Sequence, residues 1–86
     1  MRKEELYAAL NGNKFKVSNL KSSELANIMR YVKAELKLDE HSFDYYYEID
    51  VNELVNSQMP SNDFEDLKNE GWFFNETKEK IILFLT

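Results

Sequence analysis

Near its C-terminal end the chain contains five consecutive apolar residues, Ile81–Leu85, and this run restricts what the chain can fold into. A strand without a polar face has to be covered on both sides or hidden by a helix, because an exposed strand of this kind promotes aggregation. With 86 residues, the chain is long enough for one domain, 1–86, with one modest core. We therefore expect Ile81–Leu85 to be a buried strand in a small sheet.

Three further segments have strand patterns. Apolar and polar residues alternate over 43–50, with Tyr46 on the solvent side and an inward face that contains Phe43, Tyr45, Tyr47 and Ile49. A shorter alternation at 14–17 predicts another strand. Residues 72–85 predict a hairpin whose polar turn is at 75–80, with Trp72 in the core.

The N-terminal part has two helical patterns. Residues 2–11 predict a short helix that ends at Gly12, where a left-handed residue is accommodated without strain. A serine cap at Ser22 or Ser23 then precedes the clearest amphipathic pattern in the chain, which ends near Lys37. Its predicted inward residues have spacings of three and four and are Leu25, Ile28, Met29, Val32 and Leu36.

Two short helices are predicted in the C-terminal part from their capping residues. Asp50 and Glu53 have the spacing of a capping box, and Asn62 and Glu65 repeat it. Gly71 is the predicted end of the second helix. The fold class expected from these elements is α+β, with three to four short helices and a small antiparallel sheet in the order α-β-α-β-α-α-β-β.

The element order of residues 43–86 resembles a winged helix-turn-helix. In this resemblance, 62–70 takes the place of the recognition helix and the terminal hairpin takes the place of the wing. A helix that reads DNA needs basic or amide side chains at base edges and basic residues near phosphates. Segment 62–70 instead has four acids and one lysine. We therefore expect a structural helix or one presented to a protein partner.

Charge is divided between the two halves of the sequence. The basic half, 1–38, has a net charge of +4, and the acidic half, 39–86, has a net charge of −9, which together give −5. Such a division predicts a basic face and a larger acidic face, and such electrostatic fields select partners and set encounter rates. The alternative is that the two halves neutralise each other within the molecule or across a dimer.

Carboxylates in a row can imitate a phosphate backbone and occupy a basic groove on another protein. The residues that we expect to bind such a partner are Asp44, Tyr46, Glu48, Asp63, Glu65 and Asp66. A solvated polar face that only keeps the chain dissolved is the competing interpretation. The spacing of the acids lacks the Asp-rich loop and glycine of a Ca²⁺ site, so we predict no metal.

The basic half supports an alternative function, contact with nucleic acid. The candidate residues are Lys14, Lys16, Arg30, Lys33 and Lys37, the last three of which would line one side of the predicted long helix. The overall acidity counts against this function, and the same residues could be solvated lysines at the rim of a helix.

No residue set has the pattern of a catalytic or cofactor site. His41 is the single histidine and lies in a polar segment, there is no cysteine, and there is no glycine-rich phosphate loop. We therefore predict a protein that is not an enzyme and has no cofactor. The first residues lack the apolar stretch of a signal peptide, and the longest apolar run is far too short to cross a bilayer. The sequence thus favours a cytoplasmic protein without membrane contact.

These features together favour a non-catalytic module that binds a protein partner with a basic surface. In size and charge the chain resembles accessory proteins of phages and mobile elements, some of which inhibit host defence or DNA-handling proteins. Its many Asn, Lys, Tyr, Phe and Ile residues have AT-rich codons and agree with such an origin. The alternatives are a small winged-helix-like DNA-binding regulator that uses the basic half, and a structural or assembly protein that self-associates, for example as a homodimer.

Overall fold

The apolar run near the C-terminus forms the inside of an antiparallel sheet. In the computed structural model, which describes residues 2–13 and 22–85, β4 (Lys80–Phe84) lies between β2 (Tyr45–Asp50) and β3 (Phe73–Phe74). The side chains of Ile81 and Leu83 are fully buried. Ile82 and Phe84 on its other face are half-buried, so the prediction of a buried strand holds fully for one face and in part for the other.

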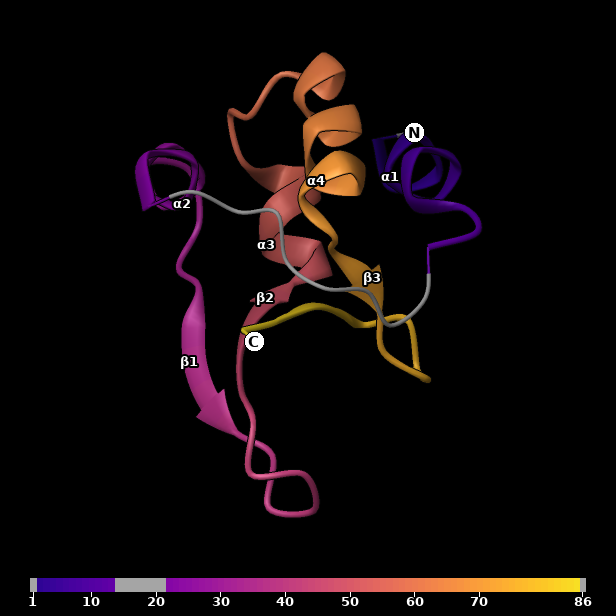
Figure 1. Cartoon of the computed structure of the whole chain (residues 1–86). Coiled ribbons are helices and arrows are strands. Elements are labelled where there is room, and N and C mark those ends of the chain that lie inside the picture. The colour runs from indigo at the N-terminus through magenta and orange to yellow at the C-terminus, as the bar shows by residue number, and fades with distance from the viewer. Residues whose placement is uncertain (1, 14–21, 86) are drawn as a thin grey trace.

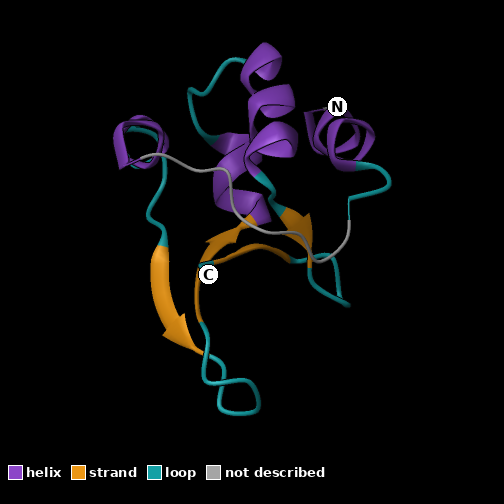
Figure 2. Cartoon of the chain, viewed as in Figure 1, coloured by secondary structure: helices purple, strands orange, loops and turns teal. Residues whose placement is uncertain are grey.

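Within residues 2–13 and 22–85 the sheet has four strands in the order β1-β2-β4-β3, and each pair is antiparallel. Figure 2 shows helices gathered above this sheet. The remaining elements are α1 (Arg2–Leu10), α2 (Ser22–Ile28), β1 (Glu35–Leu38), α3 (Val51–Asn56), the 3₁₀ helix η1 (Ser61–Asp63) and α4 (Phe64–Glu70). The predicted α+β class with a small antiparallel sheet is confirmed. The predicted strand at 14–17 lies outside the described residues.

The C-terminal half follows the predicted order of β2, α3, α4, β3 and β4. Helix α1 packs against both α3 and α4, so that three helices cover the sheet strands β2 and β4 (Figure 1). Strand β2 pairs with β4, and β4 closes a hairpin with β3. The order and pairing of these elements agree with the resemblance to a winged helix at the level of topology, with α2 and β1 between α1 and β2.

The long helix expected from Ser22 to Lys37 is wrong. Helix α2 ends at Ile28, where hydrogen bonds of the tighter i→i+3 type follow, and residues 35–38 form β1 instead. The Leu36 spacing fits a helix, but Glu35–Leu38 also alternates, and as a strand it satisfies the open edge of β2. Tertiary pairing thus overrides the local helical pattern. As a result Met29 and Leu36, both expected in the core, are exposed.

The hairpin that joins β1 to β2 has an aromatic residue in a conformation that aromatic residues rarely adopt. Phe43 has a φ of 58°, and its N–H donates to the carbonyl of Asp39 at 2.7 Å. The Phe43 side chain is 77% exposed and that of Tyr45 is 54% exposed. Both were predicted to point into the core. The prediction is wrong because β2 extends beyond the helices at this end, so nothing in the described chain covers this part of its inner face.

On the outer face of β2, Tyr46 was predicted to be exposed but is half-buried. Its ring packs against Phe84 of β4, with ring centroids 5.3 Å apart. The Phe84 ring in turn stacks on Phe73 of β3 at 6.1 Å. The outer face therefore has its own aromatic row, which the simple division into an inward and an outward face did not predict.

The predicted helix boundaries are confirmed in part. The N–H of Glu53 donates to Asp50 Oδ1 at 3.1 Å, so Asp50 is the N-cap of α3. Gly71 has a φ of 106° and ends α4 as expected. Asn62, however, is not a cap, because it lies within η1, and α4 starts without a side-chain capping bond.

Helix α1 is joined to the C-terminal half by two side chains at its ends. Arg2 donates from Nη1 to the carbonyl of Ser57 at 2.6 Å and from Nη2 to the carbonyl of Met59, and its guanidinium carbon lies 5.2 Å from the centre of the Phe64 ring. After the helix, Asn13 Nδ2 donates to the carbonyl of Trp72 at 2.8 Å. Trp72 is fully buried, as predicted. These contacts hold the loop before η1 and the end of α4 against α1.

Within the described parts of the chain, every helix is too short or too polar to cross a membrane.

The variant Phe43→Asn tests the strain in the hairpin turn. Asparagine adopts the left-handed region at lower cost than other non-glycine residues, and the exposed phenyl ring contributes little packing. We expect the free energy of unfolding to rise by up to about 1 kcal/mol, measured by urea denaturation. The matched control is Tyr45→Asn, at an exposed aromatic residue without a positive φ, which should not stabilise the fold. A destabilised Phe43→Asn variant would contradict this account of the turn.

The variant Arg2→Lys tests the fork that joins α1 to the loop before η1. Lysine keeps the charge but cannot donate to both carbonyls in the geometry of a planar guanidinium. We expect a loss of about 1–2 kcal/mol in the free energy of unfolding, measured by chemical denaturation. Lys3→Arg is the control. An Arg2→Lys variant as stable as the original chain would show that the fork contributes nothing.

Candidate functional site

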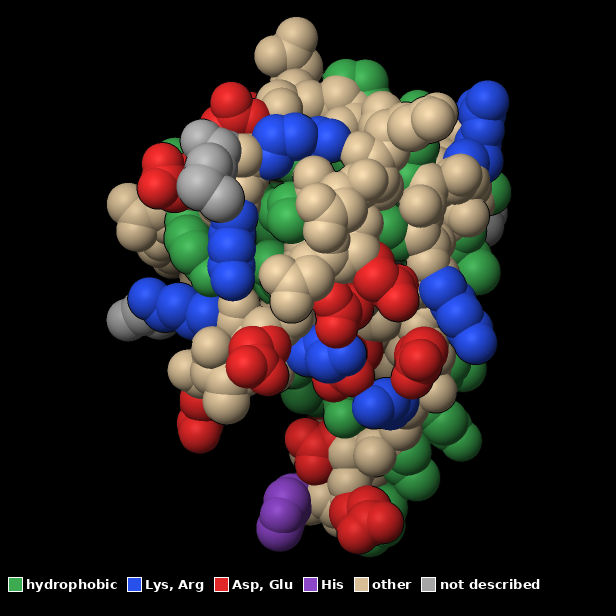
Figure 3. All heavy atoms as spheres, turned by 180° about the vertical axis from the view of Figure 1, so that it is seen from behind, with side chains coloured by type: hydrophobic (Ala, Val, Ile, Leu, Met, Phe, Trp, Pro, Cys, Tyr) green, Lys and Arg blue, Asp and Glu red, His purple; other side chains and the backbone are tan. Residues whose placement is uncertain are grey.

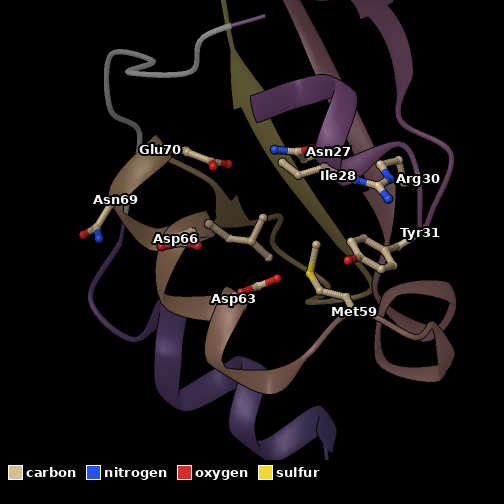
Figure 4. Close-up of a pocket in the computed structure, with 10 residues that line it drawn as sticks. Asn27, Ile28, Arg30, Tyr31, Met59, Asp63, Asp66, Asn69 and Glu70 are labelled. Carbon is tan, nitrogen blue, oxygen red and sulfur yellow. The ribbon is translucent and has the colours of Figure 1, made fainter. Parts of the chain in front are cut away.

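A groove of about 640 Å³ lies between α4 and the end of α2 with the turn that follows it (Figure 4). One wall is formed by residues 27–31 and the other by η1 and α4. Ile28, Met59 and Leu67 lie at its base with almost completely buried side chains, so most of its accessible lining is polar. The core therefore forms a firm base for this groove.

The wall formed by η1 and α4 is acidic. Asp63, Asp66 and Glu70 are spaced by three and four residues, so their side chains share one side of the helical segment. Asp66 is exposed and Asp63 is half-buried. Glu70 is buried, and its Oε1 accepts a hydrogen bond of 3.1 Å from Trp72 Nε1, which fixes its position at the end of the wall.

The wall formed by residues 27–31 carries one positive charge. Arg30 lies in the turn after α2 and is exposed, and Tyr31 is next to it. Figure 4 shows both side chains on the other side of the groove from Asp63 and Asp66. The groove therefore combines a base of buried core residues, a wall of carboxylates and one facing arginine.

The structure divides the six residues predicted to bind a partner into two groups. Asp63 and Asp66 line the groove, and Glu65 is exposed on α4 but does not line it. The other three residues are in or beside β2. Tyr46 and Glu48 alternate with Ile49, whose side chain is buried under the helices, so they project from the opposite face of the sheet. The groups do not form one continuous site.

The acids on the outer face of β2 are paired with lysines. Glu48 Oε1 is 3.0 Å from Lys37 Nζ of β1, and Asp50 Oδ2 is 3.0 Å from Lys80 Nζ of β4. Seen from behind, acidic and basic side chains are intermixed at the centre of this face (Figure 3). Asp44 is half-buried in the turn before β2. This face consequently lacks the uninterrupted row of carboxylates that imitation of phosphates requires.

The ion pairs on this face shift the pKa of their members. The hydrogen bond to Glu48 and its charge raise the pKa of Lys37. The hydrogen bond from Lys80 lowers the pKa of Asp50, and the N–H of Glu53 at the helix cap lowers it further. Each shift favours the charged form, so the pairs persist at neutral pH.

The basic residues proposed to contact nucleic acid are not arranged as predicted. Arg30 lies in a turn, Lys33 is exposed in the connection to β1, and Lys37 lies in β1. They do not line one helix, because α2 ends before all three. Lys14 and Lys16 lie outside the described residues. Arg30 faces the acidic wall of the groove, and Lys37 is paired with Glu48.

Sequence reasoning missed half of the groove. The spacing of Asp63, Asp66 and Glu70 could have been read as one helical side, but Arg30, Tyr31 and Met59 had no such signal. Their position depends on where α2 ends, and the helical pattern extended that helix too far.

The described residues contain no group of three or more His, Asp or Glu side chains placed to hold a metal ion. In comparisons with protein-family models, curated proteins and solved structures, no match to the chain was found.

The variant Asp50→Asn tests the pairs on the outer sheet face through pH. The pKa of Asp50 is lowered in the folded chain, so its carboxylate stabilises the fold above about pH 4, the ordinary pKa of the carboxyl in the unfolded chain. This stabilisation is lost as the pH falls through the pKa that Asp50 has in the folded chain. Asparagine keeps the helix cap but not the charge. We expect a lower melting temperature at pH 7 and a smaller decline on acidification.

Lys80→Met removes the largest cause of the Asp50 shift and should also reduce the decline. Melting curves between neutral and acidic pH provide the comparison. If Asp50→Asn declines as steeply as the original chain, the pair does not couple stability to pH.

Proposed function

We propose that this chain is a non-catalytic protein-binding module that receives a basic segment of a partner protein in the groove between residues 27–31 and α4. The observation that supports the proposal is the groove itself, in which Asp63 of η1 and Asp66 of α4 form an acidic wall opposite Arg30. A volume of about 640 Å³ is within the range of binding pockets and is large enough for several side chains.

The chemistry of the groove suits long basic side chains. The charged end of a lysine or arginine can reach Asp63 and Asp66, and its aliphatic part can lie against the smaller, apolar part of the groove lining. Arg30 on the facing wall would repel a second positive charge. The segment that fits best therefore has a basic residue toward α4 and an acceptor, such as a carbonyl or carboxylate, toward Arg30.

The charge around the groove also affects the rate of encounter. Glu65 of α4 and Glu5 of α1 lie beside the acidic wall, and Glu5 Oε2 accepts a hydrogen bond of 2.6 Å from Ser61 Oγ at its start. With a net charge of −5, the chain attracts basic proteins over a distance. Inhibition of a nucleic-acid-handling or defence protein, as in accessory proteins of phages and mobile elements, is the narrower form of this proposal.

A DNA-binding regulator receives less support from the geometry. In a winged-helix docking mode α4 would enter the major groove, and its acidic residues would then face phosphates. The alternative still predicts a steep fall of DNA affinity with salt, because phosphate contacts release counterions.

Selection from a displayed random-peptide library tests the groove without knowledge of the natural partner. We expect enriched peptides to contain basic residues next to an apolar residue. The double variant Asp63→Lys/Asp66→Lys should weaken the binding of these peptides by at least about tenfold, because two charge-assisted contacts become repulsive. Fluorescence anisotropy of the labelled peptides measures the affinity.

Glu65→Lys is the matched control, because it makes the same type of charge change on the same helix outside the groove. It should retain most of the affinity, and circular dichroism should show that all variants are folded. The proposal is wrong if Asp63→Lys/Asp66→Lys and Glu65→Lys reduce the affinity equally, or if the library yields no basic peptides.

A further inference from the structure

Strand β1 forms an open edge of the sheet. It pairs with β2 on one side, and among the described residues no strand pairs with its other side. All four of its residues are exposed. The N–H of Asp39 donates to the carbonyl of Asp44, so in an antiparallel ladder the alternating residues Leu36 and Leu38 direct their backbone groups away from β2. These groups are available to another strand.

The same strand has an uncovered apolar face. Leu36 and Leu38 are 54% and 44% exposed, and they lie on the inner face of the sheet beyond the helices. Phe43 and Tyr45 continue this surface along the hairpin. Figure 3 shows hydrophobic side chains along one side of the hairpin. An exposed edge strand with apolar residues is a template for pairing with another chain.

The charges of β1 identify the partner strand. On the outer face, Glu35 and Lys37 are two residues apart with Leu36 between them. We propose that β1 pairs antiparallel with β1 of a second copy, with the two-fold axis at Leu36. Glu35 of each copy then lies opposite Lys37 of the other, and the two Leu36 side chains meet on the inner face. The result is one sheet that continues through both copies, with four strands from the described residues of each.

The pairing register follows from the charges. The backbone groups that point away from β2 belong to even-numbered residues. In every allowed register, even-numbered residues of the two copies therefore face each other in the hydrogen-bonded pairs. A two-fold axis at Glu35 would place the Glu35 residues of the two copies opposite each other, and an axis at Lys37 would do the same with the two Lys37 residues. Like charges directly opposite each other destabilise a sheet. With the axis at Leu36, each Glu35 lies opposite Lys37 of the other copy, so unlike charges face each other at two places in the dimer.

A register with the axis at Leu38 would oppose Lys37 and Asp39. Asp39, however, lies beyond β1 in the turn, where its Oδ1 accepts a hydrogen bond of 2.9 Å from the N–H of His41. In the register at Leu36, Lys37 keeps its 3.0 Å contact with Glu48 and gains the carboxylate of the second copy. Non-hydrogen-bonded antiparallel pairs bring side chains close, which suits this contact.

Two charge variants test this pairing. Glu35→Lys makes both residues of the outer face basic, and Lys37→Glu makes both acidic. We expect each variant to have a dimer dissociation constant at least about tenfold higher than that of the original chain, because two attractive contacts per dimer become repulsive. An equimolar mixture of the two variants should form a heterodimer, because unlike charges again face each other. Sedimentation velocity gives the dissociation constants, and native mass spectrometry separates heterodimer from homodimer.

Glu40→Lys, at an exposed residue of the turn, is the matched control for the charge change and should dimerise like the original chain. Circular dichroism establishes that each variant is folded, and a folded Glu35→Lys variant suffices if Lys37→Glu loses its contact with Glu48 and unfolds. As a second measurement, amide hydrogen exchange of Leu36 and Leu38 should slow with increasing protein concentration.

A chain that stays monomeric up to its highest attainable concentration would overturn the proposal. Dimerisation that Glu35→Lys leaves unchanged would do so too, because the dimer would then use another surface. A failed mixture of two folded variants would contradict the register. None of these results affects the groove, because its walls at 27–31 and on α4 contain no residue of β1.

Discussion

The burial of β4 between β2 and β3 is the constraint on which the rest of the structure depends. Ile81 and Leu83 have to be covered, and the helices α1, α3 and α4 pack over this part of the sheet. One edge of β2 pairs with β4, and its other edge pairs with β1. Residues 35–38 form a strand, α2 ends at Ile28, and the turn after α2 forms one wall of the groove.

The same arrangement explains where the charges are used. The sequence halves have opposite net charge, yet Lys37 from the basic half pairs with Glu48 from the acidic half, and Arg30 faces the acidic side of α4. Part of the charge division therefore serves the architecture, as the alternative interpretation of the sequence had it. Asp63 and Asp66 of η1 and α4 are the acids that line the groove together with the buried Glu70.

Local patterns in the sequence predicted much of the fold. The hairpin of β3 and β4, the cap at Asp50 and the end of α4 at Gly71 each depend on neighbouring residues, so they were readable. The structure of residues 29–38 could not be predicted from local patterns. The spacing of Leu36 fits a helix as well as a strand, and pairing with the edge of β2 selects the strand. Only the wall with Asp63, Asp66 and Glu70 was predictable from the sequence, since the other wall depends on where α2 ends.

The central claim is that the groove beside α4, and not the acidic outer face of the sheet, receives a basic partner. Chemical-shift mapping of the ¹⁵N-labelled chain with short lysine-containing peptides tests it most directly. The account predicts that the largest shifts occur in residues 27–31 and 63–70. Largest shifts at Glu48 and Asp50, or shifts spread evenly over all acidic residues, would contradict it.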